Sequence, residues 1–253
     1  MDDAQLLDVA ERAARAAADV LVDHLGRRGA GAVTTKSSPT DLVSEADVAA
    51  EHAIRAVLAR ERPHDAILGE EGEDAPGTSG LRWIVDPLDG TVNYLFGIPQ
   101  WCVSVACEGH AGVILDPSRD ECFSVHLGGP ALLGGEPVTA STRADLATAL
   151  VATGFGYEAR VRRAQAAQVA ELLPQVRDIR RAGSAALDLA WTAAGRLDAY
   201  YERGVQRWDV EAGLLLCRAA GLEVRRLEAR GDLSSGVLVA PAGIVEPLLA
   251  IVG

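Results

Sequence analysis

The sequence predicts an α+β protein in which helices cover the faces of β-sheets. Apolar residues recur at helical spacing near the N-terminus, over residues 6–25 and again after residue 44. Short apolar runs separated by Gly and Pro turns follow between residues 66 and 125, which is typical of a sheet. From residue 150 onward, strand-like and helix-like segments alternate. Such segments bury their apolar sides best when sheets and helices pack as layers.

Two helices are expected in the first sixty residues. The first covers residues 6–25 and ends at Gly26, because glycine favours helix termination. Residues 33–35 are expected to form a short strand and residues 37–40 a loop. The second helix starts at Ser44 and runs to about residue 60. Four apolar residues are expected on its inward face: Val48, Ile54, Val57 and Leu58.

The remaining elements follow from runs of apolar residues between turns. Strands are expected at residues 66–68, 83–85, 101–106, 112–115 and 122–125, and, in the second half, at 150–152, 179–182, 199–201, 224–227 and 237–240. Helices are expected at residues 162–173, 184–194, 210–220 and 244–252.

Composition excludes several classes of function. No apolar run among the 253 residues approaches the roughly 20 that a membrane helix needs. The N-terminus lacks the basic start and apolar stretch of a signal peptide. We therefore expect a cytoplasmic protein with no membrane contact. The net charge of −12 argues against a nucleic-acid partner, because phosphate binding depends on Lys and Arg. The scattered His and Cys argue against a zinc site.

The segment from residue 83 to 93 is the most informative. An apolar strand is expected to end at Asp86, with Pro87 forcing a turn directly after it. Asp89 and Gly90 continue this turn, so both carboxylates can converge at the mouth of the sheet. Gly90 permits close backbone approach, and the N–H groups that follow, opening a helix, form a cradle for phosphate. A structural loop would explain Asp-Pro or Asp-Gly alone, but both after one apolar strand favour a site.

Three other acidic segments have strong structural explanations. Residues 69–72, Gly-Glu-Glu-Gly, fit an exposed acidic turn. Asp209 opens an apolar helix, where a capping acid stabilises by about 0.5–1 kcal/mol. Asp47 follows Ser44 at the spacing of a capping box. None of these segments identifies a site by itself.

Together, the motifs resemble one family. Residues 41–47 (DLVSEAD), 69–71 (GEE), 86–94 (DPLDGTVNY) and 208–213 (WDVEAG) resemble, in order, the signature segments of the inositol monophosphatase family. Residues 183–186 (GSAA) and 199–202 (AYYE) resemble its substrate-side segments. The resemblance covers essentially the whole chain.

This resemblance implies the fold and assembly. It implies a layered αβαβα sandwich of the inositol monophosphatase/fructose-1,6-bisphosphatase type. We expect one phosphatase domain over residues 1–253, with an N-terminal lobe of about 1–138 and a C-terminal lobe of about 139–253. The family is usually homodimeric, so a homodimer is expected here.

The resemblance also implies a metal site. The ligands of two Mg²⁺ ions, with Mn²⁺ as an alternative, would be Glu70, Asp86, the Leu88 carbonyl and Thr91 for the first ion, and Asp86, Asp89 and Asp209 for the second. A weaker third ion would lie near Glu70. Oxygen ligands without His or Cys suit Mg²⁺ or Mn²⁺ better than zinc. Two divalent cations would balance the charge of the four acids.

Catalytic and substrate-binding roles follow by position. The catalytic residues would be Asp47, Thr91 and Glu70. Asp47 would orient Thr91 and so help deprotonate the attacking water, without a covalent intermediate. The substrate would be bound by Asp89, Gly90, Thr91, Gly183, Ser184, Ala185 and Glu202. Lys36 would lie in a loop over the site. Glu211 departs from the family pattern and is expected to be peripheral, because it follows Asp209 by two helical positions.

Inositol 1-phosphate is the expected substrate. Histidinol phosphate, fructose 1,6-bisphosphate and 3′-phosphoadenosine 5′-phosphate are alternatives within the same superfamily. A non-catalytic regulatory protein with this fold is a different class of hypothesis. The presence of all four acids and of Thr91 argues against it.

Overall fold

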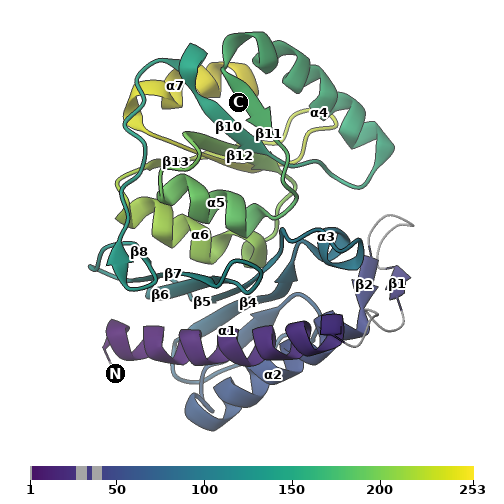
Figure 1. Ribbon diagram of the computed structural model, residues 1–253, viewed down its shortest axis with the longest axis vertical. Helices are drawn as coiled ribbons and strands as arrows, with labels where there is room; N and C mark the ends of the chain where they lie inside the picture. Colours follow the sequence, from purple (N-terminus) through teal and green to yellow (C-terminus); the bar gives the residue numbers. More distant parts are fainter. Residues whose placement is uncertain (1, 27–32, 36–41) are drawn as a thin grey trace.

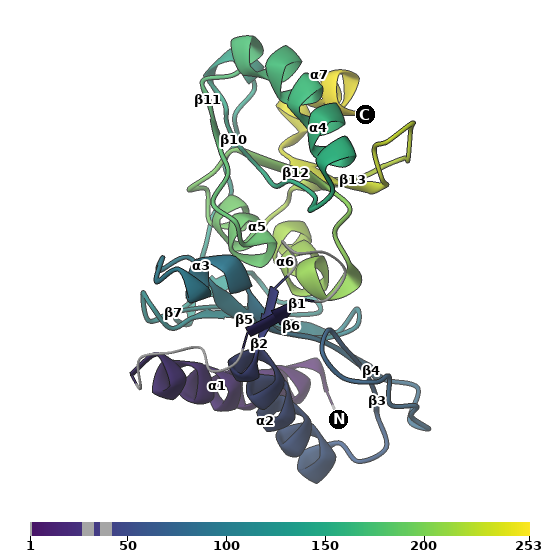
Figure 2. The same cartoon turned by 90° about the vertical axis from the view of Figure 1, so that its right-hand side faces the viewer.

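Five alternating layers of helices and sheets form the computed structural model, which describes residues 2–26, 33–35 and 42–253 (Figures 1 and 2). In order, the layers are helices α1 (Asp3–Gly26) and α2 (Glu45–Glu61), a seven-stranded sheet, helices α5 (Ala185–Ala193) and α6 (Arg207–Ala219), a five-stranded sheet, and helices α4 (Ala159–Leu172) and α7 (Ala242–Val252). The predicted αβαβα layering is confirmed. The six helices with expected bounds all lie within three residues of those bounds.

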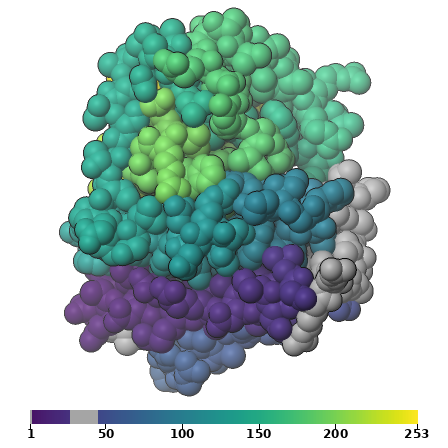
Figure 3. All heavy atoms as spheres, viewed as in Figure 1, coloured from purple at the N-terminus to yellow at the C-terminus, as the bar shows by residue number. Residues whose placement is uncertain are grey.

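Helices α1 and α2 cover the outer face of the seven-stranded sheet, and α1 lies along the width of the molecule (Figure 3). The expected inward face of α2 is partly wrong. Val48 is 40% exposed, whereas Asp47 and Glu51 are each 1% exposed. The helix is therefore rotated so that two acids point inward, and both bind neighbouring turns.

The first sheet has the strand order β3-β4-β5-β6-β7-β8-β9. Strands β3 and β4 are parallel, and the later neighbours are antiparallel. The strands are β3 (Ala66–Gly69), β4 (Arg82–Asp89), β5 (Cys102–Cys107), β6 (Ala111–Asp116), β7 (Glu121–His126), β8 (Leu132–Leu133) and β9 (Glu136–Pro137). The two-residue strands β8 and β9 were not predicted, because so short a segment shows no periodicity.

Strand β4 does not end at Asp86, which corrects the sequence-based expectation. It continues to Asp89, and its pairing with β5 shifts register between Asp86 and Asp89. Pro87 lies inside this irregularity. A proline has no N–H to donate to a neighbouring strand, so it is accommodated where the regular ladder is interrupted. The bulge, rather than a turn at Pro87, brings the two acids to the end of the strand.

The second sheet has the order β11-β10-β12-β14-β13. Its strands are β10 (Leu150–Thr153), β11 (Asp178–Arg180), β12 (Ala199–Arg203), β13 (Glu223–Leu227) and β14 (Gly236–Ala240). Helices α5 and α6 pack between the two sheets, and α4 and α7 cover the far face. Each interface is a mostly aliphatic core with a few buried aromatic side chains.

A small ribbon lies beside the first layer. Strands β1 (Val33–Thr35) and β2 (Leu42–Ser44) pair antiparallel, and β1 matches its expected range. Lys36 and the predicted loop at 37–40 lie outside the described residues. In the described part of the chain, no helix is both long and apolar enough to cross a membrane.

Candidate active site

Strand β4 carries Asp86 to the edge of the sheet, where the chain turns into the short helix α3 (Thr91–Leu95). Asp86 is 2% exposed, and its Oδ1 accepts a hydrogen bond from the Leu88 N–H at 3.0 Å. Gly90 has a φ of 98°, in the left-handed region that side chains disfavour. A Cβ there would also lie 2.8 Å from the Gln100 carbonyl oxygen. Both backbone conformation and space therefore require glycine at this turn.

The Thr91 hydroxyl joins this turn to helix α2. Its Oγ1 lies 3.1 Å from Oδ1 of Asp47 and 3.1 Å from the Leu88 carbonyl oxygen. A hydroxyl has one proton, and a carboxylate is the stronger acceptor. A buried carboxylate thus orients a hydroxyl beside Asp86. The Ser44 side chain, the other half of the predicted capping box, lies outside the described residues.

Glu70 reaches the same place from the neighbouring strand. Gly69, the last residue of β3, pairs with Val85 of β4 in parallel register, so both strands end at one edge. Glu70 follows directly, and its charge acts on the carboxyl group of Asp86. Burial raises the pKa of Asp86 well above its usual range, and the charges of Glu70, Asp89 and Asp209 raise it further.

Asp89 connects the first sheet to helix α5. Its Oδ2 accepts hydrogen bonds from the Ser184 hydroxyl at 2.7 Å and from the Ala186 N–H at 2.6 Å. Ser184 is the N-cap of α5, and its Oγ also accepts from the Leu187 N–H at 3.2 Å. Burial raises the pKa of Asp89 to about 6, although the hydrogen bonds from Ser184 and Ala186 act in the opposite direction.

Asp209 lies in the first turn of α6. Its Oδ2 accepts a hydrogen bond from the Gln206 N–H at 2.6 Å, so the capping interpretation of Asp209 is confirmed. Capping does not remove it from the acidic cluster. Burial and then the charge of Asp89 raise the pKa of Asp209 well above its usual range. Glu211 instead forms an ion pair with Arg207 at 3.6 Å.

The remaining predicted residues line the side of the second sheet. Glu202, on β12, accepts a hydrogen bond from the Tyr200 hydroxyl at 3.0 Å, and burial raises the pKa of Glu202 to about 7. Gly183 has a φ of 97°, and a Cβ there would lie 2.6 Å from a guanidinium nitrogen of Arg181. Ala185 is the buried first residue of α5.

Sequence reasoning missed two buried acids. Glu51 accepts hydrogen bonds from the N–H groups of Glu71 and Gly72. Its position four residues after Asp47, one turn further along the same helix face, was the available signal. Asp188 is 1% exposed and feels the charges of Glu202 and Asp89, and its Oδ1 accepts no hydrogen bond from the described residues. Asp188 lies within an apolar helical segment, and nothing in that pattern indicates that it is close to the other acids.

The charges of the four acids therefore act on one another, but their side chains are not arranged as a complete metal site. Within the described residues, no three His, Cys, Asp or Glu side chains form a preassembled metal site. Asp89 and Asp209 each hold one carboxylate oxygen in hydrogen bonds to protein groups. Burial and the charges of the neighbouring acids raise the pKa values of Asp86 and Asp209. Oxygen donors of this kind bind hard divalent cations.

The chain is similar to known proteins over nearly its full length. The sequence model of the inositol monophosphatase family matches residues 2–250. An inositol-1-monophosphatase of Mycobacterium bovis is 46% identical over 236 residues, which cover 88% of this chain and 81% of that protein. A Nus factor SuhB of Xylella fastidiosa is 44% identical over 220 residues, covering 85% of this chain and 79% of that protein.

Solved structures show the same fold. The crystal structure of the extragenic suppressor protein suhB of Bartonella henselae superposes with a TM-score of 0.89 at 35% identity, covering 98% of both chains. An IMPase of Thermotoga maritima gives a TM-score of 0.86 at 28% identity, covering 98% of this chain and 96% of the other. By sequence over nearly its full length, and by fold, the chain belongs to the inositol monophosphatase family.

Proposed function

We propose that this protein is a Mg²⁺-dependent phosphomonoesterase whose substrate is inositol 1-phosphate. One observation supports the proposal above others. Three separate elements, the ends of β3 and β4 and the start of α6, supply Glu70, Asp86, Asp89 and Asp209, whose charges act on one another. The name of the Mycobacterium bovis relative supports the choice of substrate.

The residues present fit a magnesium site. Glu70, Asp86, the Leu88 carbonyl oxygen and the Thr91 hydroxyl would hold one ion, and Asp86, Asp89 and Asp209 a second. A third ion near Glu70, or Mn²⁺ in place of Mg²⁺, is part of the same proposal. When bound, the ions would neutralise the acids, attract the phosphate dianion and make a water molecule more acidic.

The protein's own groups would move the proton. The Thr91 hydroxyl donates to Asp47, which leaves an oxygen lone pair on Thr91 to accept a proton from the attacking water. The proton of Thr91 would pass to Asp47 at the same time. The water oxygen would then form a bond to phosphorus as the ester P–O bond breaks, and the inositol oxygen would leave as an alkoxide that takes a proton from a second water molecule. No protein atom becomes bonded to phosphorus in this scheme.

Two groups of residues would hold the substrate. The N–H groups of Gly90 and Thr91, at the start of α3, would bind phosphate oxygens, because the first N–H groups of a helix have no acceptor within it. The alcohol would contact Asp89, Gly183, Ser184, Ala185 and Glu202. Asp89 at the end of β4 and Ser184 at the start of α5 already bind each other, so the phosphate and alcohol sides are joined by a hydrogen bond.

The dimer is proposed from the family resemblance, and the location from the sequence pattern. We infer a cytoplasmic homodimer that acts on small phosphorylated substrates. Each protomer would have two lobes, at about residues 1–138 and 139–253. Sedimentation velocity of the purified protein tests the dimer. A single species at the 26.5 kDa monomer mass would contradict it.

Phosphate release from four compounds tests the activity. Inositol 1-phosphate, histidinol phosphate, fructose 1,6-bisphosphate and 3′-phosphoadenosine 5′-phosphate are each incubated with Mg²⁺ or with EDTA. We expect Mg²⁺-dependent release that is fastest from inositol 1-phosphate. Preference for another compound would keep the chemistry and change the substrate. No release from any compound would contradict the enzyme proposal and favour a binding role, such as the Nus factor role for which the Xylella fastidiosa relative is named.

A further inference from the structure

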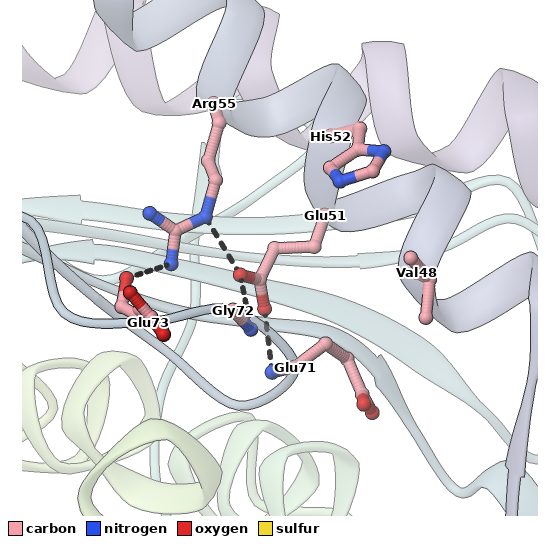
Figure 4. A pocket seen from close by; sticks show the side chains of 7 residues that line it. All are labelled: Val48, Glu51, His52, Arg55, Glu71, Gly72 and Glu73. Atoms are coloured by element: carbon pink, nitrogen blue, oxygen red, sulfur yellow. Dashed lines mark hydrogen bonds and ion pairs between the residues drawn. The ribbon is translucent and has the colours of Figure 1, made fainter.

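Glu51 is a buried carboxylate that the proposed reaction does not use. It is 1% exposed and lies on α2 one turn after Asp47. Its Oε2 accepts the Glu71 N–H at 2.8 Å and its Oε1 accepts the Gly72 N–H at 2.9 Å (Figure 4). The Arg55 Nε donates to Oε1 at 2.7 Å. The carboxylate thus binds two backbone groups of the turn after β3 and a cation.

The turn lies so close to Glu51 that no side chain would fit at its two glycine positions. A Cβ on Gly69 would lie 2.5 Å from Oε1 of Glu51, and one on Gly72 would lie 2.6 Å from the same atom. Neither glycine is among the residues with positive φ. The Gly-Glu-Glu-Gly sequence therefore leaves room on both sides for the carboxylate of Glu51.

This contact fixes the backbone that carries Glu70. The N–H of Glu71 belongs to the peptide unit that joins Glu70 to Glu71, so its hydrogen bond to Glu51 sets the plane of that peptide. Glu70 in turn lies close enough to Asp86 for its charge to act on that carboxyl group. A change in the peptide plane would swing the Glu70 side chain away from Asp86.

Arg55 completes the arrangement. Its Nη2 donates to the Glu73 carbonyl oxygen at 3.1 Å, which holds the next residue of the turn. Its positive charge also pairs with Glu51, so the buried carboxylate adds no net charge beside the acidic cluster. Figure 4 shows this group at one side of a pocket, with the Glu71 side chain turned away from Glu51.

We propose that Glu51, supported by Arg55, is a positioning residue that holds Glu70 in place to bind Mg²⁺. The inference rests on the proposed function, because it assigns Glu70 to the metal. Residues that orient metal ligands from behind typically contribute 10–100-fold to metal affinity. A purely structural ion pair would instead change stability and leave metal affinity unchanged.

Calorimetric titration of EDTA-treated protein with Mg²⁺ alone tests this inference. In Glu51→Gln one of the two carboxylate oxygens becomes an N–H₂ group. A donor that faces this group has no acceptor, so at least one of the three hydrogen bonds to residue 51 is lost. We expect Mg²⁺ affinity to fall by roughly 10–100-fold. The Mg²⁺ concentration for half-maximal turnover should rise to match, while KM for inositol 1-phosphate at saturating Mg²⁺ stays within about threefold, because metal saturation restores the orientation of Glu70.

Glu61→Gln is the matched control. Glu61 is also on α2 and pairs with Arg12 at 2.7 Å, but none of its hydrogen bonds reaches the turn at 69–72. This variant should bind Mg²⁺ as the wild type does. Unchanged affinity in a folded Glu51→Gln variant would overturn the inference and leave the proposed function standing.

A milder variant decides the matter if Glu51→Gln does not fold. Arg55→Lys keeps the charge beside Glu51 and loses the guanidinium bond to Glu73. Weakening of Mg²⁺ binding by about threefold or more would support the inference, and unchanged binding would overturn it. If the wild type itself binds no Mg²⁺, the proposed function fails and this inference fails with it.

Discussion

Replacing Glu202 by Gln is expected to stabilise the metal-free protein at high pH. Burial raises the pKa of Glu202 from 4.5 to about 7. The folded state therefore holds this proton more tightly than the unfolded state, and the free energy of unfolding falls as pH rises from about 4.5 to about 7. At about 1.4 kcal/mol per pKa unit, the full loss is about 3 kcal/mol. This is an upper limit, because the Glu202 side chain keeps some contact with water.

Glutamine removes this penalty and keeps the local hydrogen bond. Its amide oxygen can still accept from the Tyr200 hydroxyl, which lies 3.0 Å from Oε2 of Glu202. Glu202→Gln should therefore match the wild type at pH 4 and exceed it by up to about 3 kcal/mol at pH 8. For a chain of this length, that difference corresponds to a rise in Tm of roughly 6–12 °C.

Urea unfolding in EDTA at several pH values between 4 and 8.5 measures the effect. The control is Glu61→Gln, since the pKa of Glu61 is lowered by its hydrogen bond to Arg12 and the substitution should bring no gain at pH 8. An equal difference between Glu202→Gln and wild type at pH 4 and pH 8 would refute the burial argument. Because Glu202 is a proposed substrate contact, the stabilised variant should also show a higher KM for inositol 1-phosphate.

Three further substitutions test the catalytic end of β4. Asp86→Asn should lower turnover at least roughly 10²–10³-fold and leave Tm in EDTA at pH 8 undiminished, because it removes a buried charge; near-normal turnover would contradict the metal assignment. Asp47→Asn should lower kcat by roughly 10²–10⁴-fold with little change in KM, since it disorients the Thr91 hydroxyl. A lower Tm with unchanged kcat would instead support a helix-capping role. Gly90→Ala should lower the free energy of unfolding by about 1–3 kcal/mol in urea, because of its φ of 98° and the contact with Gln100, and equal stability would refute that reading of the turn.

The elements with strong periodicity were predictable, and local exceptions were not. The long helices and most strands follow from apolar spacing, since burial of one face imposes that spacing. Pro87 misled the prediction because a proline ends a regular strand but is tolerated in a bulge, and the pairing with β5 that permits the bulge is not local in sequence. Val48 was expected to be buried on α2 because it is apolar. It is exposed instead, and Asp47 and Glu51 occupy buried positions of this helix.

The acidic site was predictable only in combination. Asp209 caps its helix, as its sequence position alone indicates, and the family resemblance added its place beside Asp89. The spacing of Glu51 from Asp47 was the one signal in the sequence, and it does not show that Glu51 is buried, because an acid on a helix ordinarily faces water. Its burial depends on a turn twenty residues away that donates two N–H groups. Such a contact can be seen only after the fold is known.

The buried carboxylates fall into two groups according to their neighbours. Some are bound by protein donors and stabilise the fold, and others lie among acids and are suited to bind a cation. Glu51 is satisfied by two N–H groups and a guanidinium, and Asp47 by a hydroxyl, so neither needs an added cation. Asp86 is surrounded by other acids, which raise its pKa. A fold stable without metal would neutralise that carboxylate or replace it, since an unpaired buried charge costs several kcal/mol. We propose that a cation binds there. Helix α2 carries Asp47 and Glu51, and through them it contacts both turns that supply the proposed metal ligands.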